Sequence, residues 1–137
     1  MIYLLDSNVL SEAWKARPDA AVMVFFKDAE WFVPVPVIAE IQEGAEASPS
    51  EARKLEITAR LDFFLKRNAA VVQDWDVACA RIWGKLKHSP AVKRQPQALW
   101  DSLIDAMAVR LGATVATRNE KDFRHAPTFN PWTSKHP

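Results

Sequence analysis

Apolar and polar positions alternate along this chain in blocks that predict strands followed by helices. Residues 2–5 form an unbroken apolar run, which is typical of a strand buried on both faces. Short runs at 31–35, 70–73 and 114–116 predict three further strands. Helical apolar spacing separates these strands, and this alternation predicts an α/β fold: a three-layer α/β/α sandwich around a mainly parallel sheet.

The helical segments are recognised by apolar residues three and four positions apart, bounded by capping residues. Ser7 and Asn8 are both good caps for the first helix, and Gly112 is expected to end the last one. The expected helices cover 9–15, 20–29, 36–47, 51–67, a segment starting after Asp76, and 98–111. Residues 87–97 are expected to form a loop, and 128–137 a short edge strand with a tail.

In the helix over 51–67, the expected apolar side includes Leu55, Leu61, Phe63 and Phe64.

Composition narrows the class of protein without identifying it. With 137 residues, the chain is expected to form a single domain, 1–137. A net charge of +1 gives no global attraction to nucleic acid, so any phosphate-binding surface must be local. The single cysteine, Cys79, is expected in the core and fits a reducing compartment. No run is long enough to cross a membrane and no signal peptide is recognised, so we expect a cytoplasmic protein.

Several acidic residues occupy positions that neither the packing of a core nor the solubility of a surface explains. Asp6 directly follows the first buried strand, at the end where open α/β sheets bind ligands. Glu40 borders the apolar stripe of its helix, four residues before Gly44, whose lack of a side chain permits close approach to that face. A boundary glutamate reaching out to water is the alternative interpretation of Glu40.

Two further acids share one face of a mostly apolar helix. Asp101 and Asp105 are four residues apart, a spacing at which like charges destabilise a helix. Asp101 is also explained as an acid of the first helical turn, whereas Asp105 lies in mid-helix among apolar neighbours. Asn119 and Asp122 follow the fourth predicted strand, where turn chemistry is the alternative explanation.

All these candidate ligands are oxygen donors. The three histidines, His88, His125 and His136, are scattered through loop-like segments and are expected at the surface. No Ser–His–Asp or Cys–His arrangement is recognised in the sequence. Oxygen ligands without soft partners favour Mg²⁺ or Mn²⁺ over zinc, and such ions promote attack of water on phosphodiesters.

Four stretches in this order and spacing resemble a PIN domain, and in particular a VapC-type toxin ribonuclease of a type II toxin–antitoxin pair. They are residues 3–10, 37–44, 101–108 and 115–123, and residues 129–132 resemble the end of one bacterial branch of the family. The resemblance covers nearly the whole chain. It implies a parallel sheet flanked by helices and an endoribonuclease that uses Mg²⁺, with Mn²⁺ as a substitute.

The resemblance also implies the residues of the site. Asp6, Glu40 and Asp101 match the family's three acidic metal ligands, and Asn119 falls on a fourth position that is Asp or Asn in the family. Asp105 departs from the family, which more often has a small residue there. Either Asp105 or Asp122 is a candidate to supply the charge missing at Asn119, and one or two ions fit this set.

Candidate contacts to the substrate come from the resemblance for Ser7 and from position in the sequence, beside the proposed site, for the basic residues. Ser7 matches the hydroxyl after the first aspartate and is a candidate to bind phosphate. Arg118 and Lys121 are the preferred phosphate-binding cations; Lys85, Lys87, Lys93, Arg94 and Arg124 are further candidates, and each is equally explained as a solvated charge.

The resemblance implies three partners besides RNA: a second copy of the chain, a cognate antitoxin, and operator DNA reached only through the antitoxin. Trp14 and Trp132 are candidate interface residues.

Two rival functions remain open at the level of sequence. The chain is alternatively a weakly active toxin-like subunit that works mainly as a co-repressor with its antitoxin. A phosphatase using an aspartyl-phosphate is a third class, but it needs a second aspartate where this chain has Asn8.

Overall fold

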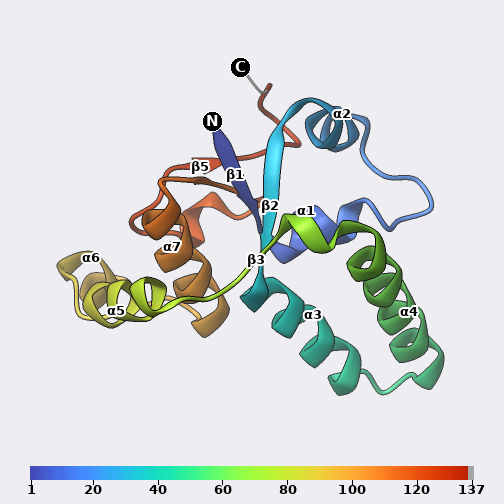
Figure 1. Cartoon of the computed structure of the whole chain (residues 1–137), viewed down its shortest axis with the longest axis horizontal. Coiled ribbons are helices and arrows are strands. Elements are labelled where there is room, and N and C mark those ends of the chain that lie inside the picture. Colours follow the sequence, from blue (N-terminus) through green and yellow to red (C-terminus); the bar gives the residue numbers. More distant parts are fainter. Residues whose placement is uncertain (136–137) are drawn as a thin grey trace.

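The computed structural model describes residues 1–135 and contains a five-stranded sheet in which every pair of neighbouring strands is parallel. Its strand order is β3-β2-β1-β4-β5 (Figure 1). The strands are β1 (Ile2–Leu5), β2 (Glu30–Pro34), β3 (Val72–Gln73), β4 (Thr114–Ala116) and β5 (Thr128–Phe129). The predicted parallel α/β fold is therefore confirmed.

Helices flank this sheet. They are α1 (Ser7–Glu12), α2 (Ala20–Asp28), α3 (Val35–Ala47), α4 (Glu51–Asn68), α5 (Val77–Leu86), α6 (Pro90–Arg94) and α7 (Leu99–Leu111), with 3₁₀ turns η1 (Ala69–Val71) and η2 (Glu120–Asp122). In Figure 1, α5, α6 and α7 lie to the left of the strands, and α3 and α4 lie to the lower right. Within residues 1–135, no helix combines the length and apolar character that crossing a bilayer requires.

The centre of the core is β1. Tyr3, Leu4 and Leu5 are fully buried, because β1 pairs with β2 on one side and with β4 on the other. The register places Leu5 opposite Ala116, so the residues that follow β1 and β4 leave the sheet side by side. This pairing positions the candidate site.

Most element predictions are confirmed, and the differences have local causes. Helix α1 begins at Ser7 because Asp6, rather than Ser7 or Asn8, is its cap. Gly112 adopts φ 64° after α7, as its position predicted. The expected loop over 87–97 is wrong in part: Ser89 caps the short helix α6 by accepting a hydrogen bond from the Val92 N–H.

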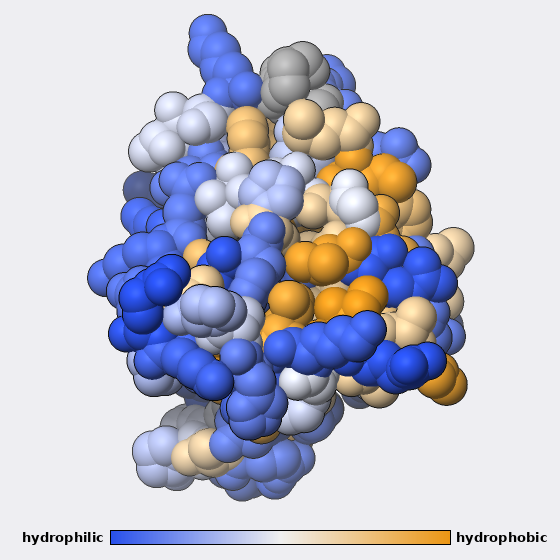
Figure 2. All heavy atoms as spheres, turned by 90° about the vertical axis from the view of Figure 1, so that its left-hand side faces the viewer, coloured by the Kyte–Doolittle hydropathy of each residue, from blue (hydrophilic) through white to orange (hydrophobic). Residues whose placement is uncertain are grey.

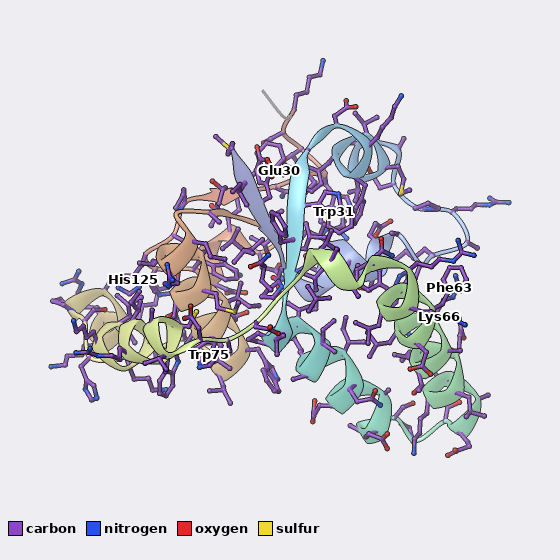
Figure 3. The ribbon with its side chains drawn as sticks, in the orientation of Figure 1. Glu30, Trp31, Phe63, Lys66, Trp75 and His125 are labelled. Atoms are coloured by element: carbon purple, nitrogen blue, oxygen red, sulfur yellow. The ribbon has the colours of Figure 1, made fainter. Side chains whose placement is uncertain are left out.

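The expected apolar side of α4 is only partly buried. Leu61 and Phe64 face the core, whereas Leu55 is 62% and Phe63 is 61% exposed. Figure 3 shows Phe63 and Lys66 on the outer side of this helix. The apolar stripe is therefore narrower than the sequence indicated, because α4 contacts the rest of the fold mainly through α3. His136, one of the predicted surface histidines, lies outside the described residues.

Candidate active site

Asp6 is held rigidly at the carboxyl end of β1. Its backbone N–H donates to the Ala116 carbonyl at 2.9 Å, which extends the β1–β4 pairing by one residue. Asp6 as a residue is only 4% exposed, and its carboxylate accepts from Ser7 N at 2.8 Å, Asn8 Nδ2 at 3.2 Å and Thr117 Oγ1 at 2.8 Å. Three donors on one buried carboxylate fix its orientation and favour its ionised form.

Thr117 is a residue of this site that the sequence analysis missed. It is fully buried, and its hydroxyl donates to Asp6 while accepting from the Asn119 N–H at 3.0 Å. The neighbouring Arg118 N–H donates to Asn8 Oδ1 at 3.2 Å. The segment after β4 is thus tied to the segment after β1. A threonine after a strand is common, so the only available signal was its position beside Asn119.

Glu40 faces Asp6 from α3. Burial raises the pKa of Glu40, and the Asp6 and Glu43 carboxylates raise it further, whereas a hydrogen bond with Ser7 lowers it. Its Oε1 atom is buried and accepts no hydrogen bond from any residue within 1–135. A buried carboxylate oxygen without a donor is costly, so this atom indicates a place for a cation or a water.

Asp101, in the first turn of α7, completes the group of facing acids. Its burial and the charges of Asp6, Asp122 and Glu40 raise its pKa to about 7, against the opposing effect of Arg124. Burial likewise raises the pKa of Asp6, with a contribution from Asp122. The structure therefore brings Asp6, Glu40 and Asp122, from three other segments, close enough to Asp101 for their charges to raise its pKa.

Asp105 has a different set of partners. Its carboxylate, 1% exposed, accepts from Ala126 N at 2.9 Å, His125 Nδ1 at 3.0 Å, Gln97 Nε2 and Arg124 N at 3.3 Å, and His125 N at 3.4 Å. These contacts use both of its oxygens. They give no support to the expectation that Asp105 replaces the charge missing at Asn119.

The expectation that His125 is a surface residue is wrong. Its ring lies beside α7 (Figure 3), and its side chain is 18% exposed. Nε2 of this ring is hydrogen-bonded to Ser89 Oγ at 2.9 Å, so Ser89, His125 and Asp105 form a series that the sequence did not reveal. Because Ser89 caps α6 and Asp105 binds three backbone N–H groups, we interpret the series as a structural tether.

The other predicted residues lie at the rim. Ser7 interacts with Glu40, whereas the side chain of Asn119 makes no described hydrogen bond with the acids. The Arg118 guanidinium lies 4.7 Å from the centre of the Trp132 ring, and Lys121 is exposed. Both cations are exposed to solvent.

The donor set fits a hard divalent cation, although the side chains do not form a closed cage. Among residues 1–135, no three His, Cys, Asp or Glu side chains converge closely enough to enclose an ion directly. Mg²⁺ is usually held by only one or two carboxylates and keeps several waters, so such a cage is not required. Facing carboxylates with raised pKa values and the unpaired Glu40 Oε1 are the features that a cation would stabilise.

Comparison with known proteins agrees with this geometry. The sequence profile of the PIN domain family matches residues 3–128, so the chain belongs to the PIN domain family. Within that family it is similar to VapC ribonuclease Y4jK of Sinorhizobium fredii, with 32% identity over 94% of this chain and 96% of the relative. PIN-domain ribonucleases are in general metal-dependent.

Two solved structures have the same fold over nearly the whole chain. FitAcB from Neisseria gonorrhoeae has a TM-score of 0.78 at 26% identity and covers 98% of this chain and 100% of that chain. VapBC2 from Rickettsia felis, bound to a DNA fragment from its promoter, has a TM-score of 0.74 at 26% identity over 95% and 98% of the two chains.

Proposed function

We propose that this chain is a Mg²⁺-dependent endoribonuclease, with Mn²⁺ able to substitute, and the toxin of a type II toxin–antitoxin pair. The observation that carries the proposal is that Asp6, Asp122 and Glu40 lie close enough to Asp101 to raise its pKa, while the buried Glu40 Oε1 accepts no hydrogen bond within residues 1–135. Ribonuclease activity also agrees with the name of the Sinorhizobium relative.

In the proposed mechanism, Asp6, Glu40 and Asp101 hold the ion, which when bound supplies positive charge to the phosphodiester and promotes ionisation of water. Thr117 keeps Asp6 in one orientation, because the hydroxyl donates to a carboxylate that the sheet already positions. Asp122, which contributes to the raised pKa of both Asp6 and Asp101, supplies the acidic charge that Asn119 lacks. Ser7, Arg118 and Lys121 are placed to contact phosphate groups.

The partners are proposed on similar grounds. The likeness to FitAcB, and to VapBC2 bound to a DNA fragment from its promoter, supports a cognate antitoxin as partner, with operator DNA bound through it. A homodimer is supported by exposed apolar side chains on α5 and α7, namely Val77, Leu99 and Val109. These helices lie on the face seen in Figure 2, where apolar residues gather among polar ones.

We place this single PIN unit, residues 1–137, in the cytoplasm with its RNA.

The co-repressor alternative is not favoured, because the acids of the site are all present and face one another. The phosphatase alternative is also weakened. Asn8 uses its side chain to bind Asp6 and the Arg118 backbone, which is a structural role.

Cleavage of single-stranded RNA by the purified chain tests the proposal. We expect cleavage with Mg²⁺ or Mn²⁺, none with EDTA, and a loss of about 100-fold or more in Asp6→Asn. The measurement is the rate of fragment formation from a labelled RNA. Equal residual cleavage by Asp6→Asn and the wild type points to a contaminating nuclease and contradicts the proposal.

Thr117→Val is expected to lower the rate of RNA cleavage by about 10- to 100-fold, because groups that orient metal ligands have effects of this size. Valine keeps the buried shape and removes the hydroxyl, which donates to Asp6 and accepts from the Asn119 N–H. The apparent Kd for Mn²⁺, measured by titrating the cleavage rate, is expected to rise. Thr117→Ser keeps the hydroxyl and should retain most activity; equal loss in both variants contradicts a positioning role.

A further inference from the structure

A groove of about 580 Å³ opens directly beside the acidic site, between α1, α3 and α4. Ser7 and Glu40 line the groove as well as the site, so the two are continuous. Trp14, Ile41 and Ile57 supply an apolar wall. A chain bound at the acids therefore has a direct path into this groove.

Two arginines on α4, Arg53 and Arg60, line the groove and are exposed. Neither takes part in an ion pair within residues 1–135, whereas Lys15 is paired with Glu12 and Lys54 with Glu46. Seven residues correspond to two helical turns, so these arginines lie on one side of α4, about 10 Å apart along its axis. The groove thus combines an apolar wall with two arginines that form no ion pair within the described residues.

We propose that this groove binds the single-stranded nucleotides on one side of the scissile phosphate. This inference rests on the proposed ribonuclease function. Arg53 and Arg60 contact backbone phosphates, and Trp14 offers an aromatic surface to a base. An apolar wall beside spaced cations is the combination that single-stranded nucleic acid uses, because its bases are free to stack while its phosphates need cations. A duplex hides its bases and cannot use the wall.

Gly44 makes the groove open to a direct steric test. It lines the groove from α3, and a Cβ placed there has no other atom within 4 Å. Gly44→Leu is therefore expected to project into the groove and narrow it, and leucine also favours the helix. Melting temperature should be unchanged or higher, whereas affinity for RNA should fall; Gly44→Ala should leave both nearly unchanged.

The main experiment measures binding of a labelled single-stranded oligoribonucleotide by fluorescence anisotropy, in an Asp101→Asn background that prevents cleavage. Arg53→Ala with Arg60→Ala is expected to reduce affinity by about tenfold. The slope of log K against log salt concentration should fall in magnitude by about 1.4, because each phosphate contact on a single strand contributes about 0.7. Glu56→Gln, which removes an acid from the groove, should tighten binding.

Lys66→Ala with Arg67→Ala is the matched control. It removes the same charge from the same helix, but Lys66 lies on the outer side (Figure 3) and Arg67 stacks on the exposed Phe63 ring. The proposal is overturned if this control lowers affinity as much as the groove variants do. It is also overturned if Gly44→Leu leaves RNA binding intact and instead blocks assembly with a partner protein. Because binding is the readout, absence of cleavage by the wild type would count against the ribonuclease function alone.

Discussion

Replacing Asp101 by asparagine is expected to stabilise the metal-free protein while reducing metal-dependent RNA cleavage by about 100-fold or more. The reason is electrostatic conflict: burial and the charges of Asp6, Asp122 and Glu40 raise the Asp101 pKa to about 7. Asparagine has similar shape without the charge. The free energy of unfolding should rise on the order of 1 kcal/mol, a typical gain when a strained functional site is relieved.

The same conflict predicts the pH dependence of stability. The pKa of Asp101 is about 7 in the folded chain against an ordinary value of 3.8, so the folded state binds the proton more tightly than the unfolded state. Stability of the metal-free protein should therefore fall as pH rises from about 4 to about 7 and level off above that. The raised pKa values of Asp6 and Glu40 act in the same direction. Asp101→Asn should flatten this profile, measured by thermal melts in EDTA.

Metal should reverse the effect in the wild type. An ion that binds only the folded state raises the free energy of unfolding by about 2.7 kcal/mol when its concentration is 100 times its Kd. The gain should be larger at pH 8 than at pH 6, because protons compete with the ion for the carboxylates. Asp101→Asn should lose most of it. Asp62→Asn, an exposed acid on α4, is the control and should behave as the wild type. If Asp101→Asn keeps the full metal-induced rise in melting temperature, Asp101 is not a ligand.

The sheet and three of its facing acids could be predicted because their signals are local. The apolar run of β1 followed by Asp6, the polar break at Glu40 in an apolar stripe, and Asp101 on an apolar helix are each visible in a short window. Alternation of strands and helices then predicted parallel pairing, which places the ends of β1 and β4 side by side.

The residues that sequence reasoning missed depend on tertiary register. Thr117 is important only because Leu5 pairs with Ala116, which sets its hydroxyl 2.8 Å from Asp6 Oδ2. Asp105 was expected to share one helix face with Asp101, but four residues advance a helix by slightly more than one turn. That small rotation gives the two aspartates different neighbours, because Asp105 meets the backbone N–H groups of residues 124–126 whereas Asp101 faces the other acids.

Replacing Asp105 by alanine is expected to lower the free energy of unfolding by about 3 kcal/mol, or roughly 10 °C in melting temperature. The carboxylate is buried and accepts hydrogen bonds from the backbone of residues 124–126, from the His125 ring and from Gln97. Alanine leaves these donors without an acceptor, and unsatisfied buried donors are costly. Thermal melts in EDTA measure the loss, with Asp62→Ala as the surface control.

Asp105→Asn separates a structural role from metal binding. Its amide oxygen can still accept the Ala126 N–H, so the variant should fold, with part of the stability loss of the alanine variant. If Asp105 is a tether, Mg²⁺ or Mn²⁺ should raise the melting temperature of Asp105→Asn as much as that of the wild type. If Asp105 is a ligand, that rise should disappear as in Asp101→Asn, while Asp122→Asn should keep it. One metal titration therefore distinguishes Asp105 from Asp122, the two candidates to supply the charge that Asn119 lacks. The structure favours Asp122, because Asp122 and not Asp105 raises the pKa of Asp101.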